Sequence, residues 1–226
     1  DKAFGSGKFY SEFEGLVNNI ERRYKETQSD YMKEEYEQYA GDADKLKALF
    51  QKGLDELGIT DKPEDITITL LSQGSATENQ LEREYLQQSI SQNLGVKVEL
   101  NTVGDYQMFA NERDNKNYDI FVGGWFSDYN DPLDFLNVMK TGVYDSYGLY
   151  SNSEYDSLID SLTGENDNAK RLEIYQKLED LLVAQDCGVA PLYYSDKHYY
   201  YQNWVKDFYT SSFGASQELY RASVQK

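Results

Sequence analysis

The stretch "YDIFVGGWFSDYNDP", residues 118–132, decides how this chain folds. Its three apolar residues at 120–122 predict a strand, because β-branched and aromatic side chains suit the pleated, half-buried surface of a sheet. Gly123 and Gly124 then end the pattern, and a Trp, acids, an Asn and a Pro follow. A strand that only fills a core has no need of such an ending, so we expect the residues after it to have a function.

The segments around this stretch alternate between helix and strand patterns. Two runs, "ITITLLS" (66–72) and "VKVELNTV" (96–103), are rich in β-branched residues or alternate apolar with polar ones. Helices are predicted at 42–58, 78–95, 105–113, 132–142, 153–164 and 167–185, and two late strands at 188–195 and 198–203. This order predicts an α/β fold with a mostly parallel sheet and helices on both faces. In such sheets ligands bind beyond the carboxyl ends of the strands, and the opening stretch is such an end.

Residues 1–41 differ from the rest of the chain. They are very polar, and their apolar residues are spaced as in a helix, at Phe13, Leu16, Val17, Ile20 and Tyr24. We therefore predict a polar helical segment at 1–41 that packs on a main α/β domain at 42–226.

The composition argues against several classes of protein. The 226-residue chain has 22 basic and 40 acidic residues, a net charge of −18, which predicts a well-solvated surface and no nucleic-acid partner, since phosphate contacts need clustered Lys and Arg. No stretch approaches the roughly 20 apolar residues that span a bilayer. The chain opens at Asp1 without a signal segment, so an exported protein would carry its targeting segment outside this sequence. Cys187 is the single cysteine, which leaves no internal disulfide, and we expect it in the core.

A metal site is one alternative for the acids after the strand. Four oxygen-bearing side chains crowd together there, namely Asp128, Asn130, Asp131 and Asp134. A calcium loop starting at Asp128 would need Gly at its sixth position and Glu at its twelfth, where the sequence has Leu133 and Met139. One His and one Cys are too few for zinc. We predict no metal and no other cofactor.

Catalysis is a second alternative. The single histidine, His198, lies among tyrosines and fits a strand better than a general base. The sequence lacks a G-x-S-x-G motif, and nothing singles out a hydrolase pair among its 40 carboxylates. We therefore predict that the protein is not an enzyme.

Asp128 is the residue with the clearest chemical role. A carboxylate beyond a strand end, three residues after Trp125, suits a cationic head group, because a charge-assisted hydrogen bond to an ammonium is short and oriented. The two glycines leave the backbone of residues 123–127 uncluttered for an extended ligand that pairs as an added strand. Alternatively, Asp128 only caps the turn or the following helix. The residues alone leave both roles open.

These motifs resemble a known family. "YDIFVGGWFSDYNDPLDFLNVMKTG" (118–142) is similar to the peptide-binding members of the family 5 extracellular solute-binding proteins, the receptors of oligopeptide and dipeptide ABC importers. The family shows a strand, Gly-Trp, an Asp-Tyr-x-x-Pro run and a helix beginning Phe-Leu. The matching residues here are Gly124, Trp125, Asp128, Tyr129, Pro132, Phe135 and Leu136. Further blocks agree in order, so the resemblance covers about residues 42–226: "DADKLKALFQKGLDELGI", "NLGVKVELNTV", "YSNSEYDSLID" and "VAPLYYS".

The resemblance implies a periplasmic-binding-protein-like fold (type II, cluster C). Residues 42–226 would form the C-terminal lobe of a two-lobe receptor whose first lobe is absent from this chain. Such a receptor closes by hinge bending on an extended peptide and delivers it to the membrane permease of an ABC importer. We expect a monomer, held by a lipid anchor at the extracellular face of the cell membrane or located in the periplasm.

The resemblance also implies which residues hold the peptide. Asp128 would bind the α-ammonium group, while Gly124, Trp125 and Phe126 would hydrogen-bond the peptide through their backbone. Gly123 and Tyr129 complete the expected peptide-binding residues. Some relatives carry an Arg shortly before the Trp that helps to bind the peptide's carboxylate, and this sequence has Val122 there.

Two other functions stay open. A receptor of the same fold could bind another solute, such as a metal chelate or an oligosaccharide, since the 21 tyrosines offer aromatic faces for sugar rings. The chain could also be a stand-alone protein-interaction module that uses the acidic helical segment at 1–41.

Overall fold

The computed structural model describes residues 42–74, 77–143, 149–192, 199–211, 213–214 and 217–225. They fall into two compact units, one within 42–124 and the other within 125–225. The helical segment predicted at 1–41 and the residue His198 lie outside the described residues. None of the described helices is long and apolar enough to cross a membrane.

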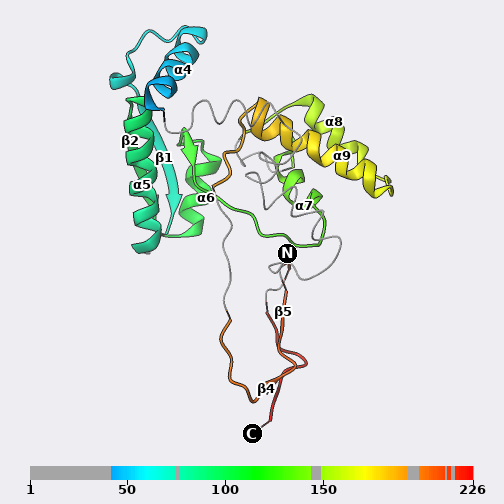
Figure 1. The fold of residues 1–226 in the computed structure, drawn as a ribbon. Helices are drawn as coiled ribbons and strands as arrows, with labels where there is room; N and C mark the ends of the chain where they lie inside the picture. The colour runs from blue at the N-terminus through cyan, green and yellow to red at the C-terminus, as the bar shows by residue number, and fades with distance from the viewer. Residues whose placement is uncertain are drawn as a thin grey trace. The chain divides into compact units, whose positions relative to one another are not determined.

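The unit within 42–124 is built on a three-stranded parallel sheet with the strand order β2-β1-β3 (Figure 1). Its elements are α4 (Ala43–Glu56), a 3₁₀ turn (Pro63–Asp65), β1 (Thr67–Gln73), α5 (Thr77–Leu94), β2 (Lys97–Val103), α6 (Tyr106–Asp114) and β3 (Ile120–Phe121). Strands that follow one another in sequence are joined through a helix, β1 to β2 through α5 and β2 to β3 through α6, as parallel pairing requires. The parallel α/β architecture predicted from the sequence is confirmed.

The two faces of this sheet carry separate apolar cores. Leu70 of β1 packs with Val98 against α4 and α5, whereas the next residue, Leu71, packs with Phe109 of α6. Successive side chains of a strand point to opposite faces, so the apolar run in β1 serves both cores. Helices α4 and α5 therefore cover one face of the sheet and α6 covers the other, as Figure 1 shows.

Helix ends in this unit follow local chemistry. The side chains of Asp42 and Asp105 accept hydrogen bonds from backbone N–H groups three residues later and so cap α4 and α6. Gly58 and Gly95 follow α4 and α5 with left-handed φ angles of 68° and 79°, which glycine adopts without a steric penalty. The helix limits predicted at these points are confirmed.

Strand β3 is shorter than predicted. Beyond its two paired residues, the Val122 N–H donates to the Leu71 carbonyl at 2.9 Å. Asp119 fixes the start of the strand, because its N–H donates to the Thr69 carbonyl at 3.0 Å and its carboxylate accepts from the Thr69 N–H at 2.7 Å. The strand thus ends where the two glycines begin.

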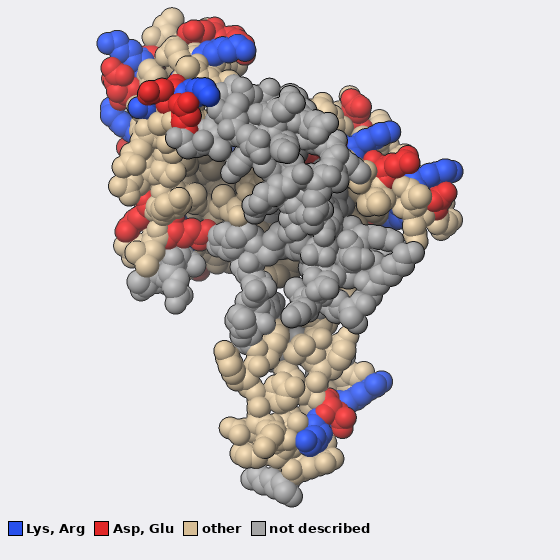
Figure 2. Space-filling view, viewed as in Figure 1, with Lys and Arg blue, Asp and Glu red and all other residues tan. Residues whose placement is uncertain are grey.

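Charged side chains of both signs are interspersed on α4. Figure 2 shows acids and bases side by side where α4 lies, at the top of the view. Lys45 lies 3.5 Å from Asp42, and Lys52 lies 3.6 Å from Glu56. Exposed pairs such as these contribute little to stability, so this surface is best described as solvated.

The unit within 125–225 has a helical core. Its elements are α7 (Leu133–Leu136), a 3₁₀ turn (Asn137–Met139), α8 (Ser153–Ser161), α9 (Asn168–Glu179), a π-helical turn (Asp180–Gln185), and the two-residue strands β4 (Val205–Lys206), β5 (Tyr209–Thr210), β6 (Gln217–Glu218) and β7 (Ser223–Val224). Tyr155 of α8 and Leu178 of α9 are fully buried in this core. The Tyr155 hydroxyl donates to the Leu136 carbonyl at 2.8 Å, which ties α8 to the end of α7.

Three predictions for this unit are wrong. The helix expected at 132–142 is a single α-helical turn continued by a 3₁₀ turn, because the backbone becomes extended at Lys140. The described parts of 188–195 and 198–203 contain no strand; Pro191 there lacks the N–H that a ladder needs, and the strands that do form are the antiparallel pairs β4–β7 and β5–β6. Cys187, expected in the core, is exposed and has a left-handed φ of 51°.

The burial of β1 makes a testable prediction. Leu71 is 0% exposed, so Leu71→Ala should lower the free energy of unfolding by about 2–5 kcal/mol through lost burial and a cavity. Leu57→Ala is the matched control, because Leu57 is 76% exposed, and it should change stability by less than about 0.5 kcal/mol. Urea denaturation checks both variants, and equal losses would contradict the described core.

Candidate functional site

The residues predicted to bind a ligand begin with the two glycines after β3. Gly123 and Gly124 are exposed at the end of the unit within 42–124. A Cβ atom added to Gly124 would meet no atom of the described residues within 4 Å, and the residue is not in the left-handed conformation. Within the described part of the chain, neither packing nor backbone strain therefore requires a glycine at this position.

The next five residues belong to the unit within 125–225 and differ sharply in burial. Trp125 is half-buried and packs against the helical core, so it anchors the segment. Phe126 is 68% exposed and Tyr129 is 47% exposed. Ser127 is buried, and Asp128 is exposed. The segment therefore presents Phe126 and Asp128 outward on either side of a buried serine.

Ser127 fixes the backbone beside Asp128. Its carbonyl accepts a hydrogen bond from the Gly214 N–H at 2.8 Å, and its hydroxyl donates to the Tyr129 carbonyl. Gly214 has a left-handed φ of 63°, and a Cβ there would lie only 3.3 Å from the Asp128 carbonyl oxygen. The close approach and the backbone conformation together explain the glycine.

Asp134, in the first turn of α7, holds Asp128 by its backbone. The carboxylate of Asp134 is buried and accepts a hydrogen bond from the Asp128 N–H at 2.6 Å. This charge-assisted contact satisfies an acid that would be costly to bury unpaired.

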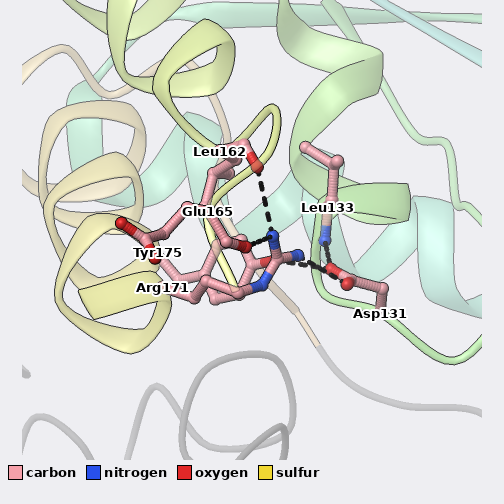
Figure 3. Close-up of polar contacts among 6 residues, drawn as sticks. All are labelled: Asp131, Leu133, Leu162, Glu165, Arg171 and Tyr175. Atoms are coloured by element: carbon pink, nitrogen blue, oxygen red, sulfur yellow. Dashed lines mark hydrogen bonds and ion pairs between the residues drawn. The ribbon is translucent and has the colours of Figure 1, made fainter. Parts of the chain in front are cut away.

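Asp131 uses both oxygens of its carboxylate within the protein (Figure 3). Oδ1 accepts from the Leu133 N–H at 2.9 Å and from the Tyr175 hydroxyl at 2.5 Å. Oδ2 accepts from Nη2 of Arg171 at 2.6 Å. We call Asp131, Arg171 and Tyr175 the Asp131 anchor.

Arg171 of α9 is itself held at several points. Its Nη1 donates to the carbonyls of Leu162 and Glu165, at 3.3 and 3.2 Å, in the turn between α8 and α9 (Figure 3). Its Nη2 also donates to the Tyr175 hydroxyl, and its guanidinium carbon lies 5.3 Å from the centre of that ring. The arginine thus connects the Asp131 loop to two helices.

The three acids of the loop therefore have different roles. The Asp131 carboxylate binds the Leu133 N–H at the start of α7 together with Arg171 and Tyr175, and the Asp134 carboxylate binds the Asp128 N–H. Among the described residues, the Asp128 carboxylate accepts no hydrogen bond and forms no ion pair. The capping role that the sequence left open for Asp128 is thus taken by its neighbours.

Sequence reasoning missed Arg171, Tyr175 and Gly214. Arg171 and Tyr175 lie 40 and 44 residues beyond Asp131, and no local pattern links them to the loop. Their spacing of four residues places both on one face of α9, and this is the one sequence feature that could have linked them to each other. It does not predict that they contact Asp131.

Burial and neighbouring acids affect the tyrosines of the site. Burial, with the hydrogen bond to Asp131 and its charge, raises the pKa of Tyr175 far above its usual value. Burial also raises the pKa of Tyr129, helped by the charges of Asp134, Asp131 and Asp128. Both hydroxyls stay protonated at neutral pH. Within the described ranges, no group of three or more His, Cys, Asp or Glu side chains is placed to hold a metal ion.

The class of protein follows from a family match. The model described as "Bacterial extracellular solute-binding proteins, family 5 Middle" matches residues 12–146, more than half of the chain. The chain therefore belongs to this family, whose members are binding proteins and not enzymes.

Individual relatives are similar to the chain over part of their length. It is 30% identical over 168 residues to the oligopeptide-binding protein OppA of Bacillus subtilis (strain 168), covering 74% of this chain and 29% of OppA. The fold matches the substrate-binding domain of an oligopeptide ABC transporter from Bacillus anthracis str. Ames, with a TM-score of 0.69 and 29% identity over 82% of this chain and 35% of that one. It also matches Listeria monocytogenes OppA bound to peptide, with a TM-score of 0.68 and 26% identity over 82% and 34%. These matches confirm the predicted fold, and the chain spans about a third of the length of these proteins.

The raised pKa of Tyr175 predicts a pH dependence of stability. The pKa of Tyr175 is higher in the folded than in the unfolded chain. Its stabilising contribution to the free energy of unfolding is therefore complete below the unfolded pKa of about 10 and is lost as the pH rises further. Tyr175→Phe should make the decline of the unfolding free energy above pH ~10 less steep, by up to about 1.4 kcal/mol per pH unit. Urea denaturation at a series of pH values around and above ~10 measures this slope. Tyr85→Phe, at a 70% exposed tyrosine, should leave the slope unchanged, and equal slopes for the two variants would contradict the prediction.

Proposed function

We propose that this chain is part of the substrate-binding component of a peptide ABC importer and that it holds the first residue of an extended oligopeptide. Relatives named as oligopeptide-binding proteins support the peptide as ligand. The observation that carries the proposal is the exposed carboxylate of Asp128, in a loop whose other acids, Asp131 and Asp134, are already bound by protein donors. This leaves Asp128 as the loop's acceptor for an external cation.

The α-ammonium group of a peptide suits this acceptor. An ammonium–carboxylate hydrogen bond is shorter and roughly twice as strong as a neutral one, and it requires a defined direction. The fixed backbone of Asp128 supplies that direction, and the net charge of −18 adds a weak, salt-screened attraction for cations. Carbohydrates and most metal chelates lack a terminal amine, so they would gain nothing from this arrangement.

Backbone pairing would hold the rest of the ligand's first residues. We assign this role to Gly124, Trp125 and Phe126, because main-chain hydrogen bonds bind peptides irrespective of their sequence. The lack of described atoms within 4 Å of a Cβ built on Gly124 supports the assignment, since a ligand strand must approach the backbone closely. Gly123 and Tyr129 would border the same ligand.

The remaining parts of the function concern the longer protein. Residues 42–226 would belong to the second lobe of a two-lobe receptor, with the polar segment 1–41 packed on it. The ligand would favour the closed state by binding it more tightly than the open one. The receptor would be a monomer, lipid-anchored at the extracellular face of the cell membrane or periplasmic, and would deliver peptides to a membrane permease.

Removing the Asp128 charge tests the site. Asp128→Asn keeps the shape of the side chain but removes the charge, so the affinity for trialanine should fall by about tenfold or more, because a hydrogen bond between two charged groups is lost. NMR chemical-shift titration of the 226-residue chain detects binding even in the millimolar range. N-acetyl-trialanine, which lacks the ammonium, should bind both forms equally weakly.

Asp61→Asn is the matched control for this experiment, because it makes the same change of charge at an exposed acid outside the loop. It should leave both affinities unchanged. If trialanine and its acetylated form bind the unsubstituted chain equally, the ammonium role of Asp128 is wrong.

Gly124→Ala tests backbone pairing. The added methyl group meets no atom of the described residues within 4 Å, so the stability should be unchanged or rise by up to about 1 kcal/mol. It would occupy space that a paired ligand needs, so the affinities for trialanine and for its acetylated form should fall together. Thermal denaturation and the same NMR titration check the two parts. Unchanged affinity for both peptides would rule out close pairing at this residue.

A further inference from the structure

We propose that Arg171 is a positioning residue: through Asp131 and Tyr175 it fixes the loop that presents Asp128, and so sets how well the site distinguishes a free α-ammonium group from a blocked one. This inference rests on the proposed function. It assigns a specificity role to a side chain that does not touch the ligand.

The first step is the fixed state of Arg171 itself. Its donors reach the Leu162 and Glu165 carbonyls, the Asp131 carboxylate and the Tyr175 hydroxyl. The side chain is only 17% exposed. Arginine offers five N–H donors in a rigid fork, so one side chain can hold three segments at once.

The second step leads from Arg171 to the start of α7. Asp131 is held on Oδ2 by Arg171 and on Oδ1 by Tyr175, while the same Oδ1 accepts the Leu133 N–H. The Asp134 N–H donates to the Asp131 carbonyl at 3.1 Å. Fixing Asp131 therefore fixes the first turn of α7.

The third step leads from α7 to Asp128. Asp134 accepts the Asp128 N–H at 2.6 Å, and the Asp131 N–H donates to the Tyr129 carbonyl at 3.0 Å. Ser127, on the other side, is held by Gly214. Residues 127–131 are thus tied at both ends, and among the described residues the Asp128 carboxylate has no hydrogen-bond or ion-pair partner.

The anchor also removes a competing acid. Without Arg171, Asp131 would be a second half-buried carboxylate in the loop, able to attract a ligand cation in another geometry. With Arg171, its charge is paired and both oxygens are bound. A single oriented carboxylate distinguishes an ammonium group more sharply than two mobile ones, because the hydrogen bond depends on direction.

Arg171→Lys is the main test. Lysine keeps the positive charge but has no planar fork, so it cannot hold the two carbonyls and Asp131 together. The measured quantity is the ratio of the affinities of the 226-residue chain for trialanine and N-acetyl-trialanine, by NMR titration. We expect this ratio to fall about fivefold, through weaker binding of trialanine alone, and the Asp128 amide to exchange faster with solvent.

Arg113→Lys is the matched control. Arg113 also pairs with an acid, Asp114, and lies 6.0 Å from an aromatic ring, Phe109, but it belongs to the other unit. This variant should leave the ratio unchanged. If Arg171→Lys does not fold, Tyr175→Phe removes the two hydrogen bonds of the Tyr175 hydroxyl but keeps the contact between Arg171 and Asp131, so it should lower the ratio by a smaller factor.

The outcomes separate the inference from the proposed function. A ratio near one in the unsubstituted chain overturns the proposed function, and this inference with it. A ratio well above one that Arg171→Lys and Tyr175→Phe leave unchanged overturns the inference alone. Equal weakening of both peptides also overturns it, since that is the effect of a purely structural residue.

Discussion

The contact between Asp131 and Arg171 is the constraint on which the rest of the loop depends. A partly buried carboxylate must be paired, because a charge removed from water without a partner costs several kcal/mol. Here the partner is an arginine that also binds two carbonyls between α8 and α9. The loop after β3 is therefore held by helices that come much later in the chain.

In this arrangement the three aspartates of the loop have different roles. Asp131 and Asp134 contribute structure, each accepting backbone N–H groups, while Asp128 remains exposed. A rigid loop favours binding because less conformational freedom is lost when the ligand arrives. The half-buried Trp125 serves the same purpose, since it packs on the helical core. In the function that we propose, this rigidity holds the Asp128 charge in place for the ligand.

Much of the fold could be predicted from the sequence where local periodicity and long-range packing agree. β1 and β2 follow the β-branched and alternating runs, α4 follows an amphipathic run, and α4 to α6 are bounded by Asp caps or terminal glycines. Prediction failed where local signals were weak. The residues around Pro191 looked like a strand by apolarity, yet Leu192 is 55% exposed and pairs with no strand, because apolar composition alone does not supply a ladder partner.

Local sequence patterns were enough to predict the order of helices and strands within 42–124, the position of the glycine-rich strand end, and Asp128 as a candidate for binding a cation. These features depend on residues within a few positions of one another, so periodicity and turn residues are enough to predict them. Which of the three acids keeps a carboxylate without a protein donor depends on contacts between distant segments of the folded chain. Asp128, Asp131 and Asp134 differ little in local context, and their roles are set by Arg171, Tyr175 and Gly214, which lie far along the chain. Hydrogen bonds between distant segments form only when the chain has folded, so no local pattern could assign them.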